Sequence, residues 1–217
     1  MNYFPILIKL DKRRVLVCGS NDEAVFQIRI LLKSSAEIFV FGSPASNKIK
    51  RWSEKKLIQY NNRLVEEKDC NNVAFAYVTL KKGTERNATL RVLTKKKILY
   101  CVVDDKLHSN FITPAIVDRN PVTVAIGSEG MAPALVRHIK AQIENILPQQ
   151  TGLVARIIGA FRPYVYRLSE SHTRRHFWAR FFNEAKSQIF SQSGAQDLET
   201  TLKKKLHNLL KNKKYKV

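Results

Sequence analysis

Residues 14–24 read RVLVCGSNDEA, and this stretch decides the first part of the fold. The run Val-Leu-Val at 15–17 suits a buried strand, Gly19 suits a tight turn, and a helix is expected from Glu23. A dinucleotide-binding loop between a strand and a helix reads G-x-G-x-x-G/A, and only its first and last positions, Gly19 and Ala24, fit here. The stretch therefore predicts a nucleotide-binding fold with an altered loop.

The chain alternates between strand-like and helix-like runs as far as residue 104. Strands are expected at 36–42, 57–62, 73–80 and 98–104, and helices at 23–34, 47–56 and 85–96. The apolar run at 73–80 suits a strand that is covered on both faces. The alternation predicts an α/β fold with a parallel sheet and right-handed crossovers.

The pattern changes beyond residue 105. Two short β-rich runs, 111–118 and 122–128, flank the turn signal Arg-Asn-Pro, and helices are expected at 132–147, 151–168, 174–190 and 197–217. We expect three parts: an α/β domain at 1–113, a small β-containing region at 114–147, and a helical C-terminal domain with a basic tail at 148–217. The exposed apolar stripe that such helices carry predicts a homodimer.

The composition limits the classes of partner. A net charge of +20 attracts polyanions such as nucleic acid, an anionic membrane or a small molecule with several carboxylates. The alternative is a bias toward lysine, in which the runs at 95–97 and 203–205 are solvated surface. The three cysteines lack metal-ligand or disulfide-framework spacing and are expected to be small buried residues.

The N-terminus MNYFPILIKL lacks the pattern of a secretory signal peptide. The chain also has no stretch of about 20 apolar residues that would span a membrane. We therefore expect a cytoplasmic protein without membrane contact.

Four stretches resemble one family, the precorrin-2 dehydrogenase/sirohydrochlorin ferrochelatase family, which is the N-terminal module of siroheme synthase. They read FPILIKLDKRRVLVCG, CVVDDKLHSNFITPAIVDRNPVTVAIGSEGMAPALVR, LPQQTGLVARIIG and RRHFWARFF. The resemblance covers residues 1–185, and no counterpart of the methyltransferase module of the fused enzymes is expected in the chain. It implies a Rossmann-like NAD-binding domain at 1–113 and dimerisation through 114–147.

The resemblance also implies the chemistry. Precorrin-2 would be oxidised to sirohydrochlorin with NAD as hydride acceptor, and ferrous iron, a substrate, would then be inserted to give siroheme. The family's general base falls on Asp104, which the residues themselves place at the carboxyl edge of a parallel sheet, where open α/β folds bind their ligands. The alternative role for Asp104 is a turn or helix cap. Asp105 beside it is expected to be a solvated turn residue.

A tetrapyrrole with several carboxylates accounts for the positive charge better than nucleic acid does, because no interleaved aromatic and basic motif is present. Lys106, Arg119 and Arg137 are the candidates that would bind it, although an arginine in such a block is as often part of a structural ion pair. Ser128 falls on a family serine, and its alternative role is a helix N-cap. No dedicated metal site is expected, and the pair His172 and His176 suits a surface better than a metal.

The departures from the family cluster at the cofactor loop. The candidate cofactor-binding residues are Gly19, Asn21, Asp22, Glu23, Ser43 and Pro44. Asn21 replaces the second glycine, although it tolerates a left-handed turn, and Glu23 places a carboxylate where the helix start would attract pyrophosphate. The stretch TLKKGTERN at 79–87 replaces the family's T-D/N-D element.

Three explanations remain open at this point. The chain is a complete but divergent dehydrogenase and chelatase, or an NAD-independent chelatase or tetrapyrrole-binding protein, or a basic scaffold that uses the fold for another purpose such as nucleic-acid binding.

Overall fold

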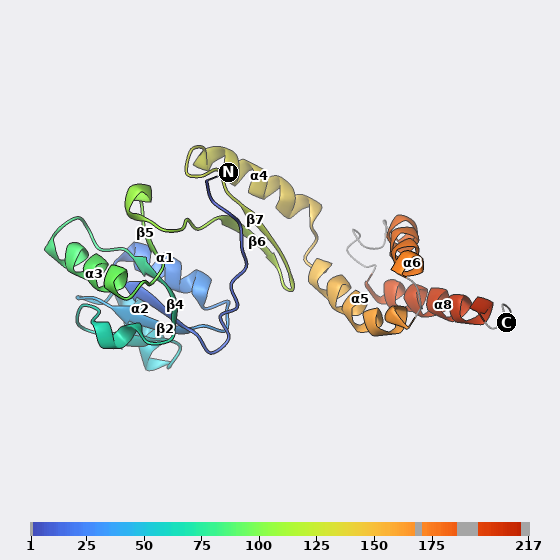
Figure 1. Ribbon diagram of the computed structural model, residues 1–217, viewed down its shortest axis with the longest axis horizontal. Coiled ribbons are helices and arrows are strands. Elements are labelled where there is room, and N and C mark those ends of the chain that lie inside the picture. Colours follow the sequence, from blue (N-terminus) through green and yellow to red (C-terminus); the bar gives the residue numbers. More distant parts are fainter. Residues whose placement is uncertain (1, 168–170, 186–194, 214–217) are drawn as a thin grey trace. The chain divides into compact units, whose positions relative to one another are not determined.

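The computed structural model describes residues 2–167, 171–185 and 195–213 of the chain (Figure 1). The chain forms two compact units, residues 1–113 and residues 114–217.

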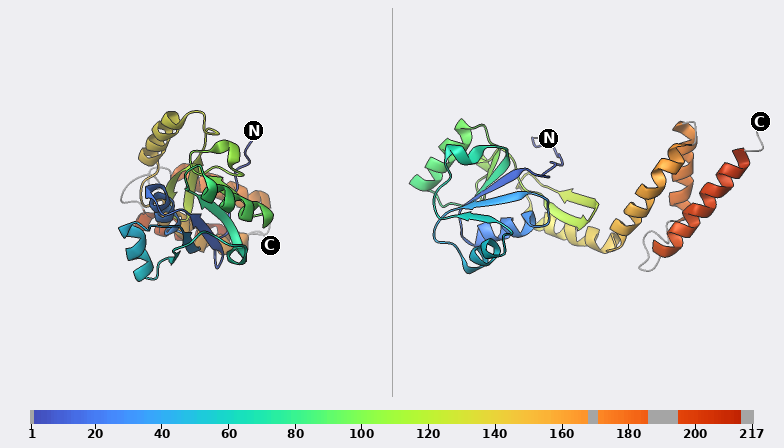
Figure 2. Two further views of the ribbon diagram at one scale, coloured as in Figure 1. Left: turned by 90° about the vertical axis from the view of Figure 1, so that its left-hand side faces the viewer. Right: turned by 90° about the horizontal axis from the view of Figure 1, so that it is seen from below.

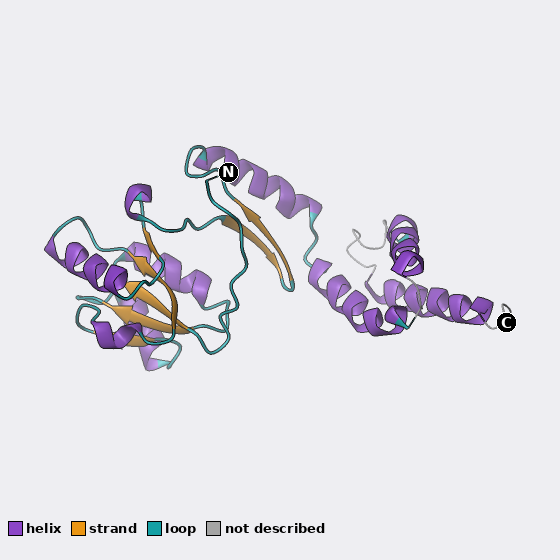
Figure 3. Ribbon diagram, viewed as in Figure 1, coloured by secondary structure: helices purple, strands orange, loops and turns teal. Residues whose placement is uncertain are grey.

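The first unit is built on a parallel sheet with strand order β3-β2-β1-β4-β5. Its strands are β1 Arg14–Cys18, β2 Glu37–Phe41, β3 Gln59–Asn61, β4 Val73–Val78 and β5 Tyr100–Val102. Its helices are α1 Asp22–Leu31, α2 Asn47–Glu54 and α3 Thr84–Lys95, with short 3-10 helices η1 Glu67–Cys70 and η2 Lys106–His108. Figures 2 and 3 show the sheet with these helices packed around it. The predicted Rossmann-like α/β fold is confirmed.

Alternate residues of β1 enter two separate cores, one on each face of the sheet. Val15 and Val17 pack with residues of α1 and α2, whereas Leu16 and Cys18 pack with Leu93 of α3. These four residues, 15–18, are buried, as expected for a central parallel strand covered on both faces. Free Cys18 and Cys70 are buried as well, and Cys101 is half-buried.

The second unit begins with an antiparallel hairpin, β6 Ala115–Arg119 and β7 Val122–Ile126, followed by α4 Pro133–Ile146. Arg119 ties the hairpin to this helix, because its guanidinium donates to the carbonyl oxygens of Leu147 at 2.9 Å and Glu144 at 3.2 Å. These are carbonyls at the C-terminal end of α4, where a helix has no backbone partners left and favours a cation.

Three further helices form their own core. They are α5 Thr151–Tyr166, α6 Ser171–Glu184 and α8 Ala195–Lys213. Phe177 and Phe181 of α6 are buried against Leu198 and Leu202 of α8. In the sequence, Leu198, Leu202, Leu206, Leu209 and Leu210 recur at helical spacing within the predicted last helix. The side chains of the last three of these leucines lie outside the described residues. Of the helices in the described ranges, none is long and apolar enough to cross a membrane.

Candidate active site at the carboxyl edge of the parallel sheet

The loops that follow β1, β2, β4 and β5 all lie at the same edge of the sheet, because the strands are parallel. Gly19 and Gly42 allow the loops after β1, β2 and β4 to pack closely against one another. A Cβ atom on Gly19 would lie 2.0 Å from Oγ1 of Thr79, and one on Gly42 would lie 3.1 Å from the backbone of Gly19. Both glycines also have positive φ, 131° and 150°. The first glycine of the altered motif thus retains its role in the turn.

Asn21 does not adopt the left-handed conformation that the sequence suggested for it. Its φ is −81°, and it is the N-cap of α1. The side-chain oxygen accepts from the backbone N–H of Ala24 at 3.1 Å, and the side-chain nitrogen donates to the carbonyl of Thr79 at 2.9 Å. Asn21 therefore stabilises the loop by occupying one of the N–H groups at the helix start that a phosphate would otherwise use.

The remaining predicted cofactor-binding residues lie beside this loop. Asp22 and Glu23 are exposed in the first turn of α1. Ser43 and Pro44 are exposed after β2, and the buried Ser20 hydroxyl donates to the Pro44 carbonyl at 2.7 Å. The loops after β1 and β2 are thus joined directly. Contact of these residues with a nucleotide stays a prediction.

The loop after β4 adds two cations that the candidate list did not include. Lys81 and Lys82 are exposed at the same edge, between Thr79 and the start of α3. In the sequence, this stretch is recognisable only as a departure from the family. The parallel register places the stretch beside the β1 loop, and this placement makes the two lysines candidates for binding an anion.

Asp104 lies just beyond the end of β5 rather than at its last residue, because pairing with β4 ends at Val102. It is exposed and has a φ of 59°, a left-handed conformation that aspartate and asparagine adopt more readily than most residues. The turn presents its carboxylate to solvent at the carboxyl edge of the sheet. Its role as a base stays a prediction.

Asp105 is not the solvated turn residue that we expected. Its side chain is only 10% exposed, and it forms an ion pair with Arg86 of α3, whose side chain is 7% exposed. Asp105 also accepts from the backbone N–H of His108 at 3.3 Å and lies 2.9 Å from Nδ1 of the His108 ring. The carboxylate therefore anchors the turn and the 3-10 helix that follow β5.

Hydrogen bonds to His108 and to Arg86 hold the pKa of Asp105 well below its usual range. A depressed carboxyl pKa stabilises the fold above the unfolded value of about 3.9. This contribution is present at neutral pH and is lost as the pH falls through the acid range.

The segment after Asp105 is fastened to β5 at several points. Ser109 Oγ accepts from the N–H of Val102 at 2.9 Å and donates to the carbonyl of Asp105 at 2.7 Å. Asn110 exchanges hydrogen bonds with the backbone of Tyr100. Residues 104–110 thus have one defined conformation beside the sheet edge.

The candidate substrate-binding residues are divided between the two units. Lys106 belongs to the first unit, and its ammonium lies 5.6 Å from the centre of the Tyr3 ring. Arg119 caps α4 as described above, and Arg137 is exposed on that helix. Ser128 Oγ accepts from the N–H of Ala132 at 3.1 Å, so it stabilises the turn before α4. Contact of these four residues with a substrate stays a prediction.

His172 and His176 are exposed on α6, and their Nε2 atoms lie 3.1 Å apart. Within residues 2–167, 171–185 and 195–213, no group of three or more histidine, cysteine, aspartate or glutamate side chains could hold a metal ion.

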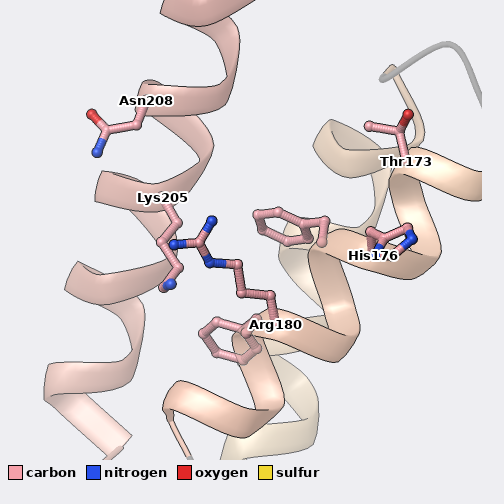
Figure 4. A pocket seen from close by; sticks show the side chains of 7 residues that line it. Thr173, His176, Arg180, Lys205 and Asn208 are labelled. Carbon is pink, nitrogen blue, oxygen red and sulfur yellow. The ribbon is translucent and has the colours of Figure 1, made fainter.

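Helices α6 and α8 also enclose a hollow of about 520 Å³. Figure 4 shows Arg180 of α6 reaching toward Lys205 of α8 across it. Glu184 forms ion pairs with both cations and offsets one of their two charges.

Comparison with known proteins agrees with this architecture. Residues 6–115 match the family model of putative NAD(P)-binding domains, and residues 150–206 match the sirohaem synthase dimerisation region. The fold and the edge loops thus define a protein with an NAD(P)-binding domain followed by a sirohaem-synthase-type dimerisation region.

Two curated relatives narrow the class further. The chain is 33% identical to the siroheme synthase of Buchnera aphidicola (subsp. Acyrthosiphon pisum, strain APS), over 95% of this chain and 44% of that protein. It is 31% identical to the siroheme synthase of Mannheimia succiniciproducens, over 94% of this chain and 44% of that protein. The chain belongs to the precorrin-2 dehydrogenase/sirohydrochlorin ferrochelatase family, the N-terminal module of siroheme synthases, and it spans less than half the length of these relatives.

A solved structure supports the fold. The precorrin-2 dehydrogenase SirC superposes with a TM-score of 0.67 at 22% identity, covering 93% of this chain and 100% of that one.

Proposed function

We propose that the chain oxidises precorrin-2 to sirohydrochlorin with NAD as hydride acceptor and inserts ferrous iron into the product to give siroheme. The observation that supports this most is Asp104, an exposed carboxylate on a defined turn at the sheet edge that carries the nucleotide loop. Open α/β folds bind their ligands at this edge. Membership of the family supplies the substrate class.

The residues at the edge fit a dinucleotide in its general features. Gly19 and Gly42 allow a close turn, and α1 begins directly behind it with its N-terminus toward the edge. Bound NAD would supply the hydride acceptor. Asn21 keeps the loop folded against the end of β4, and Ser43 and Pro44 flank the place where the nucleotide would lie.

Asp104 would accept one proton from the macrocycle in each reaction. Because the carboxylate is exposed, it can return the proton to solvent after each turnover. Lys81, Lys82 and Lys106 give this edge a positive charge, which attracts a macrocycle with several carboxylates. The two reactions would thus share Asp104 as a base and one basic surface.

An NAD-independent chelatase is the alternative that the altered loop suggested, and it is not favoured. The NAD(P)-binding model matches residues 6–115 as one continuous domain, including the loop that departs from the glycine motif. The same match argues against a basic scaffold that binds neither NAD nor a tetrapyrrole.

Purified protein should convert precorrin-2 to sirohydrochlorin when NAD is present under anaerobic conditions, and to siroheme when ferrous iron is then added. The absorbance spectra of the macrocycles and of NADH follow both steps. An arm that begins with sirohydrochlorin and omits NAD separates the two activities. Chelation without oxidation would support the alternative, and the absence of both reactions would overturn the proposal.

We infer further that the working form is a homodimer, because the second unit leaves much apolar surface exposed. No residue of α4 is buried within the unit, and Leu135 and Ile146 are 56% and 63% exposed. A second copy of the chain would cover this surface. The sirohaem synthase dimerisation model matches the residues that follow α4 in the same unit, 150–206, and this supports self-association of the unit.

Light scattering should therefore find a dimer at micromolar concentration. The double variant Leu135→Asp/Ile146→Asp should weaken association by about tenfold or more, since each change introduces a charge into an apolar contact. Gln142→Glu on the same helix is the matched control, because that exposed position is already polar. A monomeric parent, or a double variant that associates as the parent does, would contradict the inference.

A further inference from the structure

Resting on the proposed function, we propose that His108 is a second proton acceptor of this site, held in position by Asp105 and Arg86. It would work beside Asp104, from the same turn and 3-10 helix after β5. The positions of these three side chains point to this role, and the family resemblance assigns no role to His108.

The arrangement is a histidine oriented by an anchored carboxylate. Nδ1 of His108 lies 2.9 Å from both carboxylate oxygens of Asp105. Asp105 is held in turn by the nearly buried Arg86, and its Oδ1 accepts from the backbone N–H of His108 at 3.3 Å. The His108 side chain itself is 57% exposed, so the far side of the ring is open to solvent.

The carboxylate determines the tautomer of the ring. A neutral imidazole whose Nδ1 faces an ionised carboxylate carries its proton on Nδ1 and leaves the lone pair of Nε2 free. Asp105 remains ionised at neutral pH, because the hydrogen bonds to His108 and to Arg86 hold its pKa below the usual range. When Nε2 accepts a proton, the anionic Asp105 stabilises the imidazolium that forms.

The chemistry of metal insertion calls for a second acceptor. When Fe²⁺ enters a macrocycle with two N–H groups, two N–H bonds break, two Fe–N bonds replace them, and two protons leave without any redox change. Asp104 would take one proton on its carboxylate, and Nε2 of His108 would take the other. Both side chains are exposed and can release their protons to water. Oxidation of precorrin-2 releases one hydride to NAD and one proton, so Asp104 alone would be sufficient there.

The charges around the ring are compatible with this role. Asp105 is the anion that faces Nδ1, and the Arg86 cation lies on the other side of that carboxylate. Asp104 and Lys106 are the neighbouring charged residues on the same turn, and the ammonium of Lys106 lies over the Tyr3 ring. An imidazolium here would therefore gain a direct anionic partner.

The test compares the parent protein with His108→Gln in both reactions. We expect the variant to lose about tenfold or more of the chelation rate and to keep oxidation of precorrin-2 near the parent rate. The loss should be confined to iron insertion, because oxidation of precorrin-2 releases a single proton, which Asp104 accepts. His138→Gln, an exposed histidine on α4, is the matched control.

Asp105→Asn gives a second measurement of the same arrangement. It keeps the size of the side chain but removes the anion that orients the ring, so chelation should slow while oxidation of precorrin-2 stays near the parent rate. The thermal unfolding temperature of this variant measures the stability lost with the Arg86 ion pair, independently of the chelation rate. An active parent together with a His108→Gln protein of unchanged chelation rate would overturn this inference alone. A parent that performs neither reaction would overturn the proposed function and this inference with it.

Discussion

Replacing Asp104 by asparagine should lower the rates of precorrin-2 oxidation and of iron insertion by about 100-fold or more, the range expected when a positioned general base is removed. Both reactions should be affected, because both deliver a proton to this carboxylate. The loss should appear in the turnover number with little change in binding, since the amide keeps the size of the side chain.

Asparagine is the informative replacement at this position for a structural reason. Asp104 has a φ of 59°, and asparagine tolerates this left-handed conformation as well as aspartate does, whereas alanine would strain the turn. The turn and the Asp105–Arg86 pair that follows it should therefore survive the change. Unchanged thermal unfolding would confirm that the loss is chemical.

Asp11→Asn is the matched control, because this exposed aspartate lies in the turn before β1 and far along the chain from the site. It should leave both rates at the parent value. A folded Asp104→Asn protein that turns over either substrate at the parent rate would remove Asp104 from that reaction, and the base would then have to be sought among the other groups of the 104–110 segment.

The parallel sheet could be predicted because each buried strand can be recognised from its own residues. Burial on both faces makes a parallel strand apolar at consecutive positions, so β1 and β4 were recognisable from their own residues. The helices between them followed from their spacing. Asp104 could be placed for the same reason, since a residue just after a parallel strand must lie at the carboxyl edge.

The roles of Asp105 and Asn21 could not be predicted, because each depends on a partner distant in the sequence. Asp105 pairs with Arg86, which precedes it by 19 residues and comes from a different element. Asn21 donates to the carbonyl of Thr79, 58 residues away. A run of two aspartates after a strand gives no sign of which one turns inward. The left-handed φ of Asp104 and the inward ion pair of Asp105 settle that question here.

The altered loop leads to the last prediction: the chain should bind NAD more weakly than the corresponding module of its siroheme synthase relatives, and sirohydrochlorin no more weakly. Asn21 occupies the N–H of Ala24, and Glu23 adds a negative charge in the first turn of α1. A lost charge-assisted hydrogen bond costs about 1.5–3 kcal/mol, which corresponds to roughly a tenfold to hundredfold lower affinity. Titration of the protein with NAD and, separately, with sirohydrochlorin measures both affinities.

The double variant Asn21→Gly/Glu23→Val should restore NAD affinity by about tenfold or more, because it frees the Ala24 N–H and removes the competing carboxylate. Its cost to stability should be about 1–2 kcal/mol, since glycine is an acceptable N-cap but the hydrogen bond from Asn21 to the Thr79 carbonyl is lost. Glu54→Val, at an exposed position at the end of α2, controls for the loss of one negative charge.

Tight NAD binding by the parent with no gain in the variant would show that the Asn21 cap and a pyrophosphate are compatible. Weak binding by both proteins would instead assign the loss to the 79–87 segment, where TLKKGTERN stands in place of the family's T-D/N-D element.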